Sequence, residues 1–115
     1  MIRSAWSFGE AAADGLAPPA LQLGTAGRPR GGLPRVVDLS ALWAGPLCGA
    51  VLAAMSASVT KIESVRRPDP TRASTPDFFR RLNGRKAELA LDFAAAADRA
   101  RLREAIVAAD VVITS

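Results

Sequence analysis

Short apolar runs and longer helical stretches alternate from residue 35 onward, and this alternation predicts the fold. Residues 36–39 form a β-branched run that predicts a strand, and a second strand is expected over residues 58–62. The helix between them should open at Ala44-Gly45-Pro46, because proline suits the first helical turn, and run to about residue 57. It is apolar on almost every face, so we expect it to be buried on most sides. The unit predicts two parallel strands joined by a right-handed crossover.

The second half of the chain continues this order. A polar, proline-bearing loop is expected over residues 63–76, and a short helical turn over residues 77–82. Strands over residues 87–91 and 111–113 should flank a long helix over residues 97–109. This succession is typical of an open α/β sheet, mostly parallel, with flanking helices. Because a buried parallel strand normally leads into another crossover, the sheet is expected to be truncated after its fourth strand.

Residues 1–34 differ in composition from the rest of the chain. They hold six of the nine glycines and four of the eight prolines, without a sustained hydrophobic period. Such a segment is typical of a leader or a flexible linker. The predicted organisation is therefore a Gly/Pro-rich segment over residues 1–34 and one partial domain over residues 35–115.

The overall composition narrows the possible chemistry. A chain of 115 residues that is 50% hydrophobic and 23% charged can bury one modest globular core. Histidine is absent, which excludes Ser-His-Asp systems and metal sites built on imidazole. The single cysteine, Cys48, cannot form an internal disulfide and should be a small buried hydrophobe, so a cytoplasmic protein is expected. No stretch approaches the roughly 18 uncharged apolar residues of a membrane span.

Basic residues concentrate in one part of the chain. Between Lys61 and Lys86 there are eight basic residues and three acidic ones, an excess of +5 against +4 for the whole chain. In an open α/β sheet the ligand lies at the carboxyl ends of the strands, beside this span, and arginine favours phosphate. From charge alone a solvated basic loop is the simpler explanation of the excess, and a phosphorylated ligand is the alternative. Nucleic acid is disfavoured because no DNA- or RNA-binding module is present, and glycine-rich nucleotide motifs are absent as well.

Three further side chains have open interpretations. Asp38 is expected inside a strand, where a carboxylate more often caps a neighbouring loop than catalyses. Asp92, directly after the third strand, is similarly ambiguous. Trp43 is either a packing residue or the wall of a ligand pocket.

Seven segments in order resemble the amino-terminal signature of the class III coenzyme A transferases (the CaiB/BaiF family). Each segment alone is weak, but their order and spacing make the resemblance strong over residues 35–115. In sequence order they are Val36-Val37-Asp38-Leu39-Ser40, Ala44-Gly45-Pro46, Val59-Thr60-Lys61-Ile62-Glu63, Asp69-Pro70-Thr71-Arg72, Asn83-Gly84-Arg85-Lys86, Leu89-Ala90-Leu91-Asp92-Phe93 and Ala109-Asp110-Val111-Val112-Ile113.

The resemblance implies a Rossmann-like domain that binds coenzyme A (CoA) or acyl-CoA as substrate, without a metal. Two positions depart from the family pattern, because Ser64 stands where Arg is frequent and Ala94 where Lys is frequent; Arg66 or Arg67 could supply the missing charge. The residues expected to contact CoA are Trp43, Ala44, Ser64, Arg66, Arg72, Asn83, Lys86, Leu91, Asp92, Phe93, Ala94 and Ser115.

The resemblance also implies a reaction: acyl-CoA and a carboxylic acid exchange CoA through an aspartyl intermediate. The nucleophilic Asp of the family would lie beyond Ser115, so the chain is expected to be an inactive CoA-binding part of a longer protein. Interlocked homodimers are expected of that parent, with no nucleic-acid or membrane partner. An acyl-CoA racemase of the same family, a non-catalytic CoA- or nucleotide-binding module, and a subunit completed by a second polypeptide remain alternatives.

Overall fold

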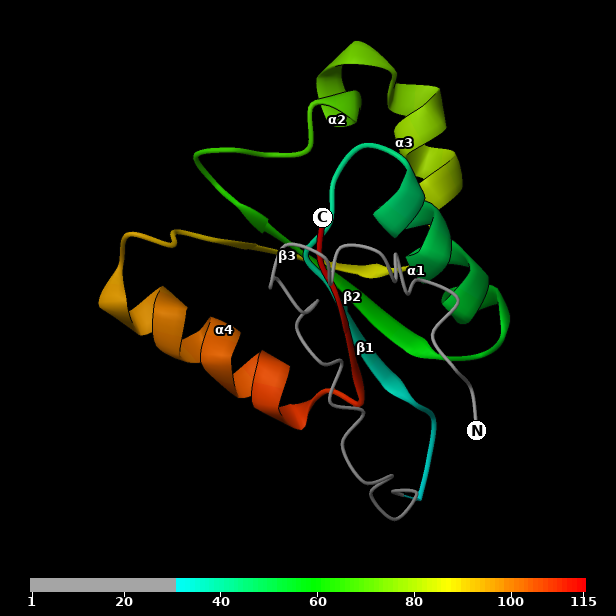
Figure 1. Cartoon of the computed structure of the whole chain (residues 1–115). Coiled ribbons are helices and arrows are strands. Elements are labelled where there is room, and N and C mark those ends of the chain that lie inside the picture. Colours follow the sequence, from blue (N-terminus) through cyan, green and yellow to red (C-terminus); the bar gives the residue numbers. More distant parts are fainter. Residues whose placement is uncertain (1–30) are drawn as a thin grey trace, which may run out of the picture.

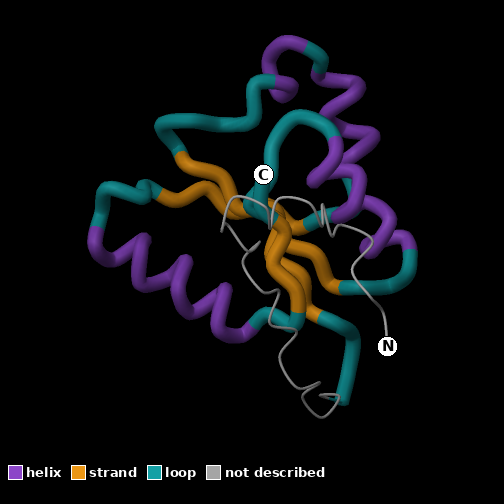
Figure 2. Tube along the Cα trace, in the orientation of Figure 1, coloured by secondary structure: helices purple, strands orange, loops and turns teal. Residues whose placement is uncertain are grey.

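The computed structural model describes residues 31–115, which form a four-stranded parallel sheet with helices on both faces (Figures 1 and 2). The predicted leader over residues 1–34 lies almost entirely outside the described residues. The strand order is β3-β2-β1-β4, so β3 and β4 form the edges of the described sheet. The elements are β1 (Arg35–Asp38), α1 (Ala44–Ala54), β2 (Ser58–Ser64), α2 (Thr71–Ser74), α3 (Pro76–Asn83), β3 (Ala87–Leu91), α4 (Ala96–Ala108) and β4 (Val111–Ile113).

The two faces of the sheet are covered by different helices (Figure 1). Helix α4 covers the apolar face, where Val37, Ile62 and Leu91 form the buried cluster against Leu102 and other residues of α4. Helix α1 covers the opposite face, and α3 packs against α1. Because side chains alternate along a strand, the neighbours Asp38 and Lys61 lie on this second face, beneath α1 and α3.

The burial of helix α1 differs from the expectation. It is not buried on most sides: among its residues only Pro46 and Gly49 are buried, and Cys48 is exposed rather than buried. The helix approaches the sheet through its glycines, since a Cβ on Gly45 would lie 2.2 Å from Ser40 Cβ and one on Gly49 would lie 2.8 Å from Asp38 Oδ2. Its larger apolar side chains therefore lie on its other faces.

Helix α1 begins where expected but ends earlier. It starts at Ala44, the first residue of the Ala44-Gly45-Pro46 segment, and ends at Ala54 rather than at residue 57. The end is set by Ser56, whose φ of 70° is left-handed, with Ala57 N–H donating back to the Leu52 carbonyl at 3.0 Å. An apolar pattern cannot locate such a turn.

Helix α2 is a second correction, because a loop was expected over residues 63–76. Strand β2 continues two residues further, to Ser64, and the chain then forms a four-residue helix. Asp69 begins it by accepting hydrogen bonds from Thr71 N–H at 3.0 Å and Thr71 Oγ1 at 2.7 Å. Four residues are too few to produce a helical period in the sequence.

Candidate functional site

A cavity of about 380 Å³ lies at the carboxyl ends of the strands, the edge at which a ligand is expected. Segments following all four strands contribute to its wall. Aliphatic side chains from the core form one part of the lining, and hydroxyl and charged groups form the other. The lining residues are Leu39, Ser40, Ala41, Ile62, Glu63, Ser64, Arg67, Asp69, Phe93, Leu102 and Ser115.

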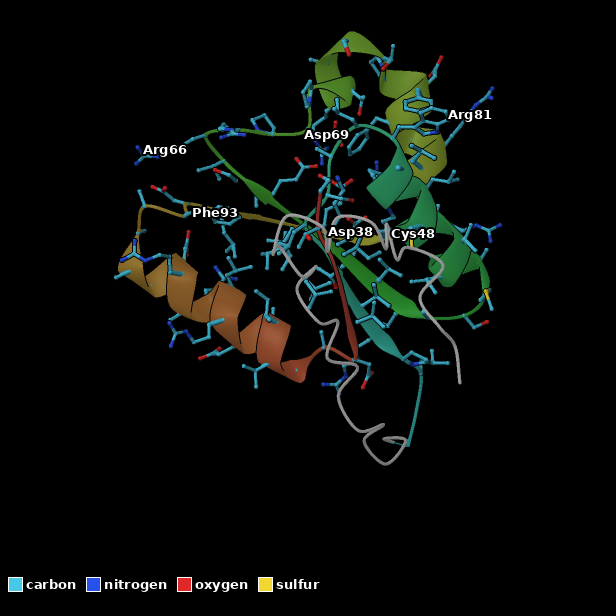
Figure 3. All side chains as sticks on the ribbon, in the orientation of Figure 1. Asp38, Cys48, Arg66, Asp69, Arg81 and Phe93 are labelled. Atoms are coloured by element: carbon cyan, nitrogen blue, oxygen red, sulfur yellow. The ribbon has the colours of Figure 1, made fainter. Side chains whose placement is uncertain are left out.

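Two adjacent arginines after β2 take different positions. Arg67 lines the cavity, and no ion pair engages its guanidinium within residues 31–115. Arg66 does not line it; its side chain is 68% exposed and bonds Asp92 twice, from Nε and Nη2, at 3.1 Å each. Arg66 lies on the outer side of this edge (Figure 3). Arg67 is therefore the arginine that an anion in the cavity would meet first.

Three of the residues expected to bind CoA line the cavity together: Ser64, Phe93 and Ser115. The Ser64 hydroxyl accepts the N–H of Arg66 at 3.2 Å, and the Ser115 hydroxyl accepts the N–H of Ala41 at 3.3 Å. A hydroxyl that accepts one bond still has its own proton to donate. This wall thus offers two hydroxyl donors and an aromatic ring beside Arg67.

Trp43 and Ala44 lie just outside this lining. The Trp43 side chain is 66% exposed at the start of α1, two residues beyond Ala41 in the cavity wall. Within the part of the chain that the structure describes, no side chain caps the amino end of α1. Trp43 is therefore accessible to a ligand that extends out of the cavity.

The guanidinium of Arg72 is already paired with neighbouring side chains. Its guanidinium bonds Glu63 at 3.3 Å and Glu88 at 3.0 Å, and it lies 4.1 Å from the centroid of the Phe79 ring. Burial lowers the pKa of Arg72, but its bonds to the two carboxylates outweigh this and raise the pKa overall. The structure gives Arg72 the role of joining β2, β3 and α3.

Asn83 and Lys86 are buried beneath α1. Lys86 Nζ donates to Asp38 Oδ2 at 2.7 Å, to the Pro46 carbonyl at 2.8 Å and to Asn83 Oδ1 at 2.8 Å. The side chains of Lys86 and Asp38 are fully buried. This arrangement ties α1 and α3 to the end of β1.

Burial and hydrogen bonds shift the pKa values of both Asp38 and Lys86. Burial opposes ionisation of Asp38, but hydrogen bonds from Lys86 and Ser40 outweigh it and hold the pKa of Asp38 below its ordinary value. Burial lowers the pKa of Lys86, and its bond to Asp38 opposes this only in part. Asp38 accepts bonds from both the N–H and the hydroxyl of Ser40 besides Lys86, and these bonds favour its charged form. The expectation that Asp38 caps a loop is therefore confirmed.

The remaining expected residues follow β3. Leu91, the last residue of β3, is completely buried in the apolar core, and its carbonyl accepts the N–H of Val65 at 3.0 Å, so it offers no exposed atom to a ligand. Asp92 accepts bonds from Arg66 and from Ala94 N–H, and these bonds hold its pKa below the ordinary value. Asp98 closes the turn from α4 by accepting the N–H of Asp92 at 2.7 Å.

Sequence reasoning missed Lys61 and Asp69. Lys61 Nζ donates to the Ser40 carbonyl at 2.8 Å and lies 3.3 Å from Asp69 Oδ2, and both side chains are almost completely buried. Lys61 is the one charged residue of the β-branched run Val59-Thr60-Lys61-Ile62 in the centre of β2, and this was the signal in the sequence.

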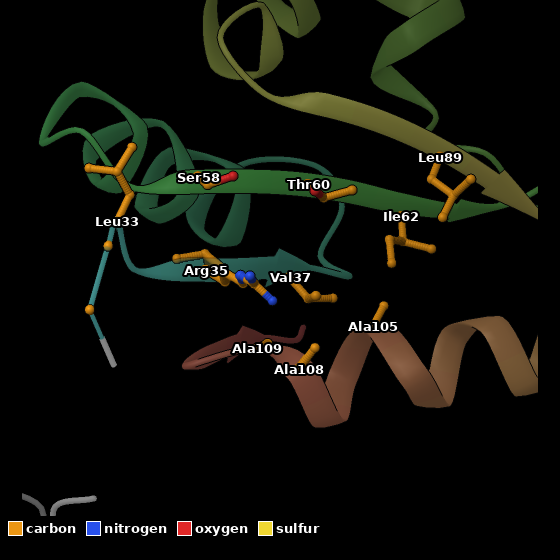
Figure 4. A pocket seen from close by; sticks show the side chains of 13 residues that line it. Leu33, Arg35, Val37, Ser58, Thr60, Ile62, Leu89, Ala105, Ala108 and Ala109 are labelled. Atoms are coloured by element: carbon orange, nitrogen blue, oxygen red, sulfur yellow. The ribbon is translucent and has the colours of Figure 1, made fainter. Parts of the chain in front are cut away.

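The hollow on the α4 side of the sheet offers less chemistry than the candidate site. A larger hollow of about 580 Å³ lies between α4 and the amino ends of the strands, and its lining is mainly small and apolar (Figure 4). Within residues 31–115, no group of three acidic or cysteine side chains could hold a metal ion. No helix in the same range is long and apolar enough to cross a bilayer.

The fold and the cavity define an open α/β domain whose candidate ligand site lies at the carboxyl ends of parallel strands. The family model of CoA-transferase family III matches residues 34–115, and the chain belongs to this family. A protein named acyl-CoA transferase from Fusarium pseudograminearum (strain CS3096) is 33% identical over 94 residues, which cover 69% of this chain and 21% of that protein. The chain thus spans about a fifth of this relative. No solved structure matches the chain.

Proposed function

We propose that residues 34–115 form the CoA-binding amino-terminal part of an acyl-CoA:carboxylate CoA-transferase. The observation that carries this proposal is the cavity at the strand ends, where Arg67 lies beside the hydroxyls of Ser64 and Ser115. A phosphate group requires cationic and hydroxyl donors of this kind. Family membership supplies CoA as the phosphorylated ligand of first choice.

In this proposal the parts of CoA bind to different surfaces. Arg67 and the two serine hydroxyls hold a phosphate, and Phe93 borders the same space. Trp43, exposed near the cavity mouth, offers an aromatic face to the adenine or to the pantetheine chain. Arg72 acts indirectly, by fixing Glu63 at the edge of the site.

We propose further that the carboxylate that attacks the thioester is neither Asp38 nor Asp92. A nucleophilic carboxylate needs access to the substrate and a free oxygen. Asp38 is fully buried and bonded to Lys86, while Asp92 bonds Arg66 through both of its oxygens. In this proposal these two carboxylates support the binding site, and the aspartyl step is assigned, as the family resemblance implies, to another part of the intact transferase.

The test is a calorimetric titration of CoA into the full 115-residue chain and into two single variants. Arg67→Gln should weaken binding about 10- to 100-fold, because a hydrogen bond to a charged group contributes about 1.5–3 kcal/mol. Arg66→Gln is the matched control and should change the Kd less than about twofold, since that side chain faces away from the cavity. No binding by the unaltered chain, or equal losses in both variants, would overturn the proposal.

A further inference from the structure

The segment between β1 and α1 is held residue by residue through its backbone. Leu39 N–H donates to the Ile113 carbonyl at 2.9 Å and Ser40 N–H to Asp38 Oδ1 at 3.0 Å. Ala41 N–H donates to Ser115 Oγ and Leu42 N–H to Asp69 Oδ2, at 3.3 and 3.2 Å. Residues 39–42, which we call the β1–α1 turn, therefore have a fixed partner for every N–H.

Leu42 has the least favourable backbone conformation of this turn. Its φ is 70°, in the left-handed region that residues other than glycine rarely adopt. Its side chain is 55% exposed, so packing of that side chain does not impose the conformation. The contact that does reach Leu42 is the hydrogen bond from its N–H to Asp69.

Both oxygens of the buried Asp69 carboxylate have partners in the structure. Oδ1 accepts the N–H and the hydroxyl of Thr71, and Oδ2 accepts Leu42 N–H and faces Lys61 Nζ at 3.3 Å. Lys61 in turn holds the Ser40 carbonyl at 2.8 Å. The Lys61–Asp69 pair therefore forms hydrogen bonds to the turn at two points, the Ser40 carbonyl and the Leu42 N–H.

We propose that Asp69 is a positioning residue of the ligand site: its buried carboxylate holds the left-handed turn at Leu42 and thereby sets where Ala41 and Trp43 meet the ligand. The proposal rests on the proposed CoA site for the identity of that ligand. Ala41 and Asp69 both line the cavity, and Trp43 directly follows Leu42. Burial tends to raise the pKa of Asp69, but its bonds to Thr71 and Lys61 hold the pKa below its ordinary value, so the carboxylate is charged at neutral pH.

The test combines CoA affinity with the fluorescence of Trp43 in the full chain. Trp6→Phe makes Trp43 the one tryptophan, and Asp69→Asn is introduced into that background with Asp77→Asn as control. Asp77 is a suitable control because its side chain is 86% exposed on α3 and distant from the cavity lining. Asp69→Asn should weaken CoA binding about tenfold and change acrylamide quenching of Trp43, whereas Asp77→Asn should change neither.

A second background separates positioning from a general loss of stability. Leu42→Gly removes the conformational penalty of the turn, because glycine adopts positive φ freely. The loss of CoA affinity caused by Asp69→Asn should therefore be smaller in the Leu42→Gly chain than in the parent. An equal loss in both backgrounds would overturn the proposal.

A measurement on the unaltered chain makes the conclusion independent of whether Asp69→Asn folds. The Leu42 amide should be protected from hydrogen exchange relative to a free chain, because it donates a hydrogen bond to Asp69. Exchange at the free-chain rate would overturn the proposal. If the unaltered chain binds no CoA, the proposed function fails, while amide protection and Trp43 quenching still decide whether Asp69 holds the turn.

Discussion

Replacing Lys86 by methionine tests how strongly the buried pair supports the fold. The methionine side chain matches that of lysine as far as Cε and fills similar space, so the main change is loss of the ammonium group. Three acceptors lose their donor together: Asp38 Oδ2, the Pro46 carbonyl and Asn83 Oδ1. Asp38 keeps only its bonds from Ser40, in a site where its side chain has no exposed surface.

The size of the effect follows from this burial. Leaving one member of a buried ion pair without its partner costs about 3–5 kcal/mol, because the remaining charge is no longer compensated. The total stability of a small domain is only about 5–15 kcal/mol. With a urea dependence of about 2 kcal/mol/M, a loss of about 4 kcal/mol lowers the denaturation midpoint by about 2 M.

The assay is urea unfolding of the full chain, followed by circular dichroism, with two companion variants. Arg80→Met removes a cation whose partner, Asp77, is largely exposed, so it should cost at most about 1 kcal/mol. The double variant Asp38→Asn/Lys86→Met removes both charges and should recover more than half of the loss. The reasoning is wrong if Lys86→Met costs no more than Arg80→Met, or if the double variant is as unstable as the single one.

Two further predictions concern the same buried face. Gly49→Ala should destabilise the protein by about 1–3 kcal/mol, because the new Cβ would lie 2.8 Å from Asp38 Oδ2 and 2.9 Å from Lys86 Nζ, both fixed by hydrogen bonds; a raised Tm would contradict this. The lowered pKa values of Asp38 and Asp69 add stability that is complete above their unfolded value of 3.8 and is lost as pH falls through the lower folded values. Unfolding of the Asp38→Asn/Lys86→Met variant should therefore depend less steeply on pH below about 4, and parallel curves for the two proteins would contradict the assignment.

The order of strands and long helices along the chain was predictable, because each of these elements depends on its local hydrophobic pattern. The four strands are observed where apolar or β-branched runs predict them, and β3 and β4 match the expected residues 87–91 and 111–113. The end of α1 and the existence of α2 were not predictable, since they depend on the backbone conformation of Ser56 and on the side-chain bonds of Asp69. Those features arise only when distant segments are already in contact.

The location of the candidate site could be predicted from the sequence, but the residues that line it could not. The rule that ligands bind at the carboxyl ends of parallel strands located the cavity, and Ser64, Phe93 and Ser115 do line it. Asn83 and Lys86 belong to the same sequence signature but lie beneath α1, bonded to each other. A motif therefore combines residues that face a ligand with residues that hold the fold, and spacing alone does not separate the two.

The basic excess between residues 61 and 86 shows why pairing, not charge count, decides which cation can bind a ligand. Both lysines of the span are buried in ion pairs, and Arg66, Arg72 and Arg80 each bond a carboxylate. Arg81 lies on the far side of the molecule from the cavity edge marked by Phe93 (Figure 3). A +5 span thus supplies one cavity-lining arginine without a carboxylate partner in the described range, Arg67. For this reason the comparison of Arg67→Gln with Arg66→Gln, two neighbours of equal charge, tests the site more sharply than any change in net charge.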